Sequence, residues 1–138
     1  MVSSDEVDQL GEVPAAIVDP IRASCLALPD AYEEQAWTGI RWLVGRKTFA
    51  HILLIDEGWP PAYAREAGTD GPACVLMVRS SGDDLEALRR AGPPYFAPVW
   101  RSHEIGLVLG LDPDHVDWAD VTELVSVSFR LRRGRSPG

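Results

Sequence analysis

The stretch Trp37–Ile55, WTGIRWLVGRKTFAHILLI, decides the fold. Most of its positions are apolar, aromatic or β-branched, which is the composition that half-buried strands favour. Gly45 permits the backbone dihedral angles of a short reversal, so the stretch predicts two antiparallel strands joined by a tight turn at residues 45–47. The second strand is apolar on both faces toward its end. We therefore expect it to lie centrally in a sheet or to be covered on both sides.

This hairpin is basic in an acidic chain. The 138 residues carry a formal net charge of −8, yet the hairpin holds Arg41, Arg46 and Lys47 and no acidic residue. A second basic cluster closes the chain and consists of Arg130, Arg132, Arg133 and Arg135. Affinity for nucleic acid depends mostly on cationic contacts with phosphates, so the net charge argues against a general nucleic-acid binder. The negative net charge remains compatible with local phosphate contacts at the two basic segments.

The rest of the chain predicts a single domain over residues 13–131, between a disordered acidic tail, 1–12, and a basic tail, 132–138. A first helix is expected to begin at the N-cap Asp19 and to end at Pro29, followed by an acidic turn over 30–34. The alternative is a helix that also includes residues 13–18 and is kinked at Pro20. Residues 56–73 are rich in proline, glycine and charge and predict an irregular, exposed loop. The later elements are expected to be strand 74–79, helix 81–92, strands 99–101 and 105–111, and a helix capped by Asp117. This order predicts an α+β fold, with one antiparallel sheet of about five strands and helices packed on one face.

Residues with recognisable chemistry are sparse. The chain has no glycine-rich phosphate loop, no HExxH and no GxSxG motif. Its three histidines are far apart in sequence, and Cys25 and Cys74 lack the spacing of a zinc site. The sequence thus predicts no catalytic residue, no metal site and no cofactor, and it favours a non-enzymatic protein.

Location and assembly are predicted from what the sequence lacks. The N-terminus has no basic and apolar signal regions, and no apolar run approaches the ~20 residues of a membrane span. We expect a cytoplasmic protein without a membrane partner, either a monomer or a small homo-oligomer.

Residues 25–52, CLALPDAYEEQAWTGIRWLVGRKTFAHI, resemble the MmcQ/YjbR family of small bacterial proteins. That family has a helix ending in Leu-Pro, an acidic turn, a Trp-x-Gly entry to the first strand and a Gly-x-Lys-x-Phe reversal. The corresponding residues here are Leu28-Pro29, Glu33-Glu34, Trp37 and Gly39, then Gly45, Lys47 and Phe49. A second match is Val116-Asp117-Trp118 followed by Leu124 and Ser128, so that the resemblance covers about residues 19–130.

The chain departs from the family at two places. A tryptophan that the family often has in its penultimate strand is missing near Ile105, and RLRRGRSPG replaces the usual Ala-Pro-Lys ending. The resemblance implies a CyaY-like or double-wing fold. It also implies DNA binding, which family members are assigned from the likeness of their fold, although a fold does not fix a function.

Two candidate sites follow. The first is a weak nucleic-acid contact through the hairpin and the tail, formed by Arg41, Arg46, Lys47, Arg132 and Arg133. The competing interpretation is a solvated hairpin tip. The second is a small-molecule pocket formed by Trp37, Trp59, Trp100 and His51, with the 56–73 loop as its lid. Here the competing interpretation is structural packing.

Overall fold

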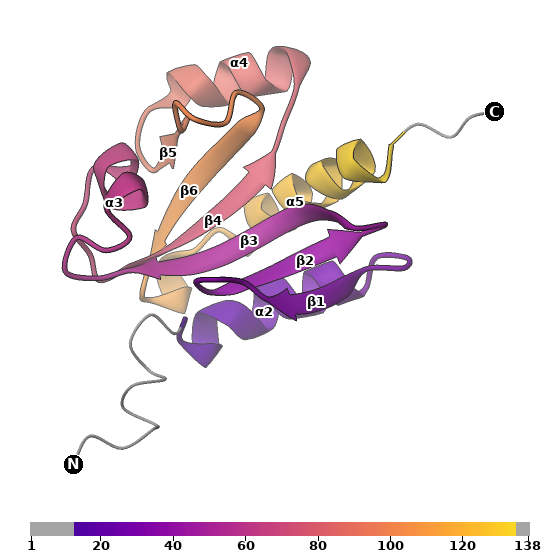
Figure 1. Ribbon diagram of the computed structural model, residues 1–138, viewed down its shortest axis with the longest axis horizontal. Helices are drawn as coiled ribbons and strands as arrows, with labels where there is room; N and C mark the ends of the chain where they lie inside the picture. The colour runs from indigo at the N-terminus through magenta and orange to yellow at the C-terminus, as the bar shows by residue number, and fades with distance from the viewer. Residues whose placement is uncertain (1–12, 135–138) are drawn as a thin grey trace.

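The protein has one six-stranded antiparallel sheet in the order β1-β2-β3-β4-β6-β5, with four α-helices packed around it (Figure 1). The structure, a computed structural model, describes residues 13–134. The predicted α+β class with a single antiparallel sheet is confirmed. The expected tail 1–12 and residues 135–138 lie outside the described residues.

The strands are β1 (Tyr32–Gln35), β2 (Ile40–Val44), β3 (Lys47–Ile55), β4 (Ala73–Arg79), β5 (Tyr95–Phe96) and β6 (Glu104–Gly110). The α-helices are α2 (Ala15–Leu26), α3 (Pro61–Ala67), α4 (Gly82–Ala91) and α5 (Trp118–Arg133), and a short 3₁₀ helix, η1, spans Pro113–His115. Because α5 continues to Arg133, the first two residues of the expected basic tail are helical.

The predicted hairpin is confirmed as β2 and β3. Val44 pairs with Lys47 across a two-residue turn, in which Gly45 and Arg46 both have positive φ angles, 54° and 74°. This is the turn geometry whose twist matches that of the flanking strands. As expected, β3 lies centrally, between β2 and β4.

The two faces of the sheet are covered by different helices. On one face, α2 and α5 bury the larger core, which includes Trp42, Ile52, Leu76 and Val125. On the other face, α3 covers a smaller cluster around Leu53, Ile55, Tyr63, Ala64, Val75 and Met77. Since α3 lies near the C-terminal end of β3 (Figure 1), the N-terminal half of β3 is left without a helix on this face.

Four expected segments differ from the structure. The first helix begins at Ala15, before its expected N-cap Asp19, and Pro20 lies inside it. The acidic turn over 30–34 is wrong, because Glu33 and Glu34 lie in β1 and pair with Trp42 and Arg41 of β2. The irregular 56–73 loop is also wrong, since its middle forms α3. The strand over 99–101 is wrong as well: these residues form a turn, and the additional strand is β5. In the last three cases, contacts with distant segments override the local sequence pattern.

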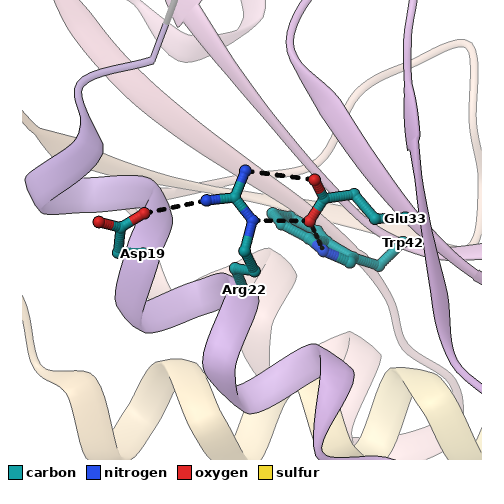
Figure 2. A network of polar contacts seen from close by, with 4 residues as sticks. All are labelled: Asp19, Arg22, Glu33 and Trp42. Atoms are coloured by element: carbon teal, nitrogen blue, oxygen red, sulfur yellow. Dashed lines mark hydrogen bonds and ion pairs between the residues drawn. The ribbon is translucent and has the colours of Figure 1, made fainter.

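An ion-pair network joins α2 to the edge of the sheet (Figure 2). Arg22 on α2 donates from Nε and Nη2 to the carboxylate of Glu33, at 2.8 and 3.2 Å, and from Nη1 to Asp19 at 2.9 Å. The same Glu33 carboxylate accepts a 2.9 Å hydrogen bond from Nε1 of the fully buried Trp42. Glu33 thereby satisfies the polar group of the largest core side chain, which explains an acidic residue inside a strand.

Candidate functional site

The site begins where β3 and β4 part. Their last direct pair is Ala50 with Val78, and the next positions along the register are Phe49 and Arg79. The buried hydroxyl of Ser128 on α5 bridges these two residues: it donates to the carbonyl oxygen of Phe49 at 2.5 Å and accepts from the backbone N–H of Arg79 at 2.8 Å. A helix side chain thus replaces a strand-to-strand contact.

The C-terminal end of α5 brings a cation to the same place. Nε of Arg132 donates to the carbonyl oxygen of Thr48 at 3.1 Å, next to the parted strands. Burial lowers the pKa of Arg132, and the nearby positive charge of Arg79 lowers it further. Two guanidinium groups therefore lie close enough to repel each other, which an anion between them would relieve.

A cavity of about 280 Å³ opens here, on the part of the sheet face that α3 leaves uncovered. Five arginines from separate parts of the chain line it: Arg41 on β2, Arg46 in the hairpin turn, Arg79 at the end of β4, Arg101 before β6, and Arg132 on α5. Its other lining side chains include Trp37, Phe49, His51, Met77 and Glu104. We call this the arginine cavity.

Two of the five arginines have acidic partners. Arg41 contacts Glu34 at 2.6 Å across the β1–β2 pair, and Arg101 contacts Glu104 at 2.9 Å. Within residues 13–134, no carboxylate lies within 4 Å of the guanidinium groups of Arg46, Arg79 and Arg132. The cavity therefore carries positive charge in a chain whose net charge is −8.

His51 connects the cavity to the β1–β2 turn. Its Nε2–H donates to the carbonyl oxygen of Thr38 at 2.7 Å, because a carbonyl oxygen can only accept. Burial lowers the pKa of His51 below its usual value of 6.5, against the opposing effect of this hydrogen bond, so the ring is neutral at pH 7. His51 thus positions the turn and adds no charge to the arginine cavity.

Trp37, Trp59 and Trp100 lie in two groups of aromatic contacts beside the cavity, and of the residues in these groups only Trp37 and His51 line it. Trp37 and Trp59 meet edge to face with ring centroids 5.7 Å apart. The ring of Tyr63 lies between His51, at 6.5 Å, and Trp100, at 5.3 Å, again edge to face. All three tryptophans are exposed, and Trp37 is the most exposed of them at 68%.

The structure brings together residues that the sequence assigned to two separate sites. Arg41, Arg46 and Arg132 from the expected nucleic-acid contact line the same cavity as Trp37 and His51 from the expected pocket. The other predicted residues lie elsewhere.

Lys47 is exposed at the hairpin tip and does not line the cavity, and Arg133 lies over the ring of Phe129 at 5.7 Å. Trp59 contacts Trp37, and Trp100 contacts Tyr63. Residues 61–67 of the expected lid form α3, which packs on the sheet through buried Tyr63 and Ala64, and no residue from 56–73 lines the arginine cavity.

Sequence reasoning missed Arg79 and Arg101. Arg79 follows the buried positions of β4, and in an alternating strand it shares a face with Met77 and Val75. A polar residue at the end of a buried strand was the available signal. Arg101 had no such signal, since it lies in a turn between β5 and β6.

Other chemistry is limited among the described residues. No group of three or more His, Cys, Asp or Glu side chains within 13–134 is arranged to hold a metal ion. Cys25 and Cys74 are buried free thiols, and burial raises the pKa of both, to about 12 for Cys74. None of the described helices is long and apolar enough to cross a membrane. The arginine cavity is therefore the best-supported candidate site.

Comparison with known proteins identifies the family. The YjbR family model matches residues 26–131, which is more than half of the chain. The chain belongs to the YjbR family. This YjbR chain is also similar to a crystal structure of a protein from Pseudomonas syringae, with a TM-score of 0.48 and 22% sequence identity, over 77% of this chain and 80% of that one. A search of curated proteins found no match.

Proposed function

We propose that this YjbR-family protein is a non-enzymatic binding protein that holds backbone phosphates of a nucleic-acid strand in the arginine cavity. The observation that supports the proposal is the convergence of five arginines, from β2, the hairpin turn, β4, the turn before β6 and α5, on one cavity. The five arginines are spread over the sequence, so it is the tertiary fold that brings them together. Their like charges repel one another. An anionic ligand balances that repulsion.

Phosphate is an anion that this arrangement suits. A guanidinium group is planar, stays charged, and donates two parallel hydrogen bonds to phosphate or carboxylate oxygens. Arg46, Arg79 and Arg132 have no acidic partner within residues 13–134, so their charge is available to a ligand. The net charge of −8 opposes a long polyanion, and we expect weak binding, with a Kd of about 10⁻⁴–10⁻⁶ M.

A salt titration tests the proposal. Fluorescence anisotropy of a labelled single-stranded 10-mer is measured against the wild type and the double variant Arg46→Gln/Arg79→Gln. Each lost phosphate contact should lower the slope of log affinity against log salt by about 0.7 for a single strand, so the double variant should lose about 1.4. The charge-matched control replaces Arg65 and Arg90, which are exposed on α3 and α4 and do not line the cavity.

The salt slopes of the two variants distinguish a contact in the cavity from a general effect of charge. The control variant should keep the wild-type slope, because its lost charges are outside the cavity. If the wild type fails to bind at low salt, or if the control loses as much slope as the cavity variant, the arginine cavity is not a nucleic-acid site.

A small phosphate- or carboxylate-bearing molecule is the second candidate. The volume of about 280 Å³ favours it, since that space lies close to the lower limit of the range for small-molecule pockets. Pyrophosphate is the probe: thermal stabilisation of the wild type, but not of the Arg46→Gln/Arg79→Gln variant, together with no oligonucleotide binding, would favour this candidate over the first.

A further inference from the structure

Trp37 is held at the rim of the arginine cavity by a turn that has little freedom. The backbone N–H of Ala36 donates to the carbonyl oxygen of Gly39 at 3.1 Å, closing the turn between β1 and β2. Gly39 has a φ of 75°, and a Cβ there would lie 1.9 Å from the carbonyl oxygen of Ile52. The turn is therefore pressed directly against β3, at a distance that only glycine permits.

The residue after Trp37 is fixed as well. Thr38 is buried, and its carbonyl oxygen accepts the hydrogen bond from His51. Trp37 itself is 68% exposed, although its neighbours Ala36 and Thr38 are anchored by hydrogen bonds, and Trp37 is one of the residues that line the cavity. An exposed ring on a fixed backbone offers a flat apolar surface whose position is set before any ligand arrives.

The cavity and this ring together match a ligand with two parts. The guanidinium groups of Arg46, Arg79 and Arg132 suit a phosphate, and an exposed indole beside them suits a planar aromatic ring. A nucleotide has both groups on one scaffold. In a duplex the base is stacked and paired inside the helix, so it cannot reach an aromatic side chain without being extruded.

We infer that the arginine cavity and Trp37 together bind one unpaired nucleotide of a single strand, with its phosphate among the arginines and its base against the indole. This inference rests on the proposed function and adds to it the recognition of a base. It makes single strands the preferred ligand, and it assigns that preference to Trp37, whereas the arginines account for the charge-dependent part of the affinity.

Three probes of equal length test it by fluorescence anisotropy: a single-stranded 10-mer, an abasic 10-mer with the same phosphates and no bases, and a 10-base-pair duplex. Stacking of one base on an aromatic side chain corresponds to a roughly 5- to 150-fold gain in affinity. The wild type should bind the single strand tighter than the abasic strand by a factor in this range. Trp37→Ala should remove that difference, with the salt slope for the abasic strand unchanged.

Trp100→Ala is the matched control, because Trp100 is an exposed tryptophan on the same side of the sheet and does not line the cavity. It should keep the wild-type preference for bases, and thermal unfolding of both variants checks that they fold. Equal binding of single and abasic strands by the wild type overturns base recognition and leaves the phosphate proposal intact. A loss of preference in Trp100→Ala equal to that in Trp37→Ala overturns the assignment to Trp37. No binding of any probe at low salt removes both proposals.

Discussion

The hydroxyl of Ser128 allows the clearest prediction of stability. This side chain is fully buried on α5 and bridges β3 and β4 where they part. Ser128→Ala removes both hydrogen bonds with almost no change in volume. The carbonyl oxygen of Phe49 would remain buried without a donor, at a cost of about 1–3 kcal/mol. The N–H of Arg79 lies beside the cavity, where water can replace the lost acceptor, and its lost hydrogen bond adds about 1 kcal/mol. We therefore expect a total loss of about 2–4 kcal/mol in the free energy of unfolding.

Urea denaturation followed by tryptophan fluorescence measures this loss as the shift in midpoint multiplied by the m-value. Ser126→Ala is the matched control on the same helix, since Ser126 is only partly buried and makes no side-chain hydrogen bond within residues 13–134. It should cost less than about 0.5 kcal/mol. A loss below about 1 kcal/mol for Ser128→Ala, or equal losses for the two variants, would refute the bridging role of the hydroxyl.

Three further predictions concern other parts of the molecule. The guanidinium group of Arg22 on α2 holds the pKa of Glu33 below its usual 4.5. The Glu33 carboxylate therefore stabilises the fold above pH 4.5, and this stabilisation is lost as the pH falls through the lowered pKa. Urea midpoints measured from pH 3 to 7 should thus fall less steeply on acidification in Glu33→Gln than in the wild type. Gly39→Ala should destabilise the protein by more than about 2 kcal/mol in the same assay, whereas Gly45→Ala, which also has a positive φ but open space around it, should cost about 1 kcal/mol. Because burial raises the pKa of Cys74 to about 12 and that of Cys25 above its usual range, both thiols should react with a thiol reagent at pH 8 only as fast as the chain opens; rapid labelling of the native protein would contradict their burial.

The central hairpin was predictable from sequence because its information is local. Runs of apolar, aromatic and β-branched residues on both sides of a glycine are sufficient to specify two paired strands. β1 was not predictable in this way, since Glu33 and Glu34 fit a strand only through their partners Trp42 and Arg41. The helix α3 was not predicted, because the prolines and glycines around it indicated an irregular loop. A helix of seven residues gains its stability from the burial of Tyr63 and not from its own propensity.

The candidate site was predictable only in part. The basic character of Arg41, Arg46 and Arg132 was visible in the sequence, but their meeting with Arg79 depends on the parting of β3 from β4 and on the path of α5. From the sequence, the basic and the aromatic residues were assigned to two different sites. Only the fold shows that Trp37 and the arginines line one cavity. Residues that converge from five segments leave no common local pattern.

The order of the strands has a consequence for the solubility of the folded chain. Six consecutive residues of β4, Ala73–Val78, are buried, and their sequence, ACVLMV, has no charge, proline or glycine, which is the composition of segments that form amyloid-like stacks. β4 lies inside the sheet with a partner strand on each side. The two edge strands are β1, which has four residues and two of them glutamates, and β5, which has two residues and follows Pro93 and Pro94. Short, charged or proline-flanked edges give a second chain little backbone to pair with. The native protein thus buries its most aggregation-prone segment, and any partial opening that frees β4 from β3 or β6 exposes backbone with which a second chain can pair.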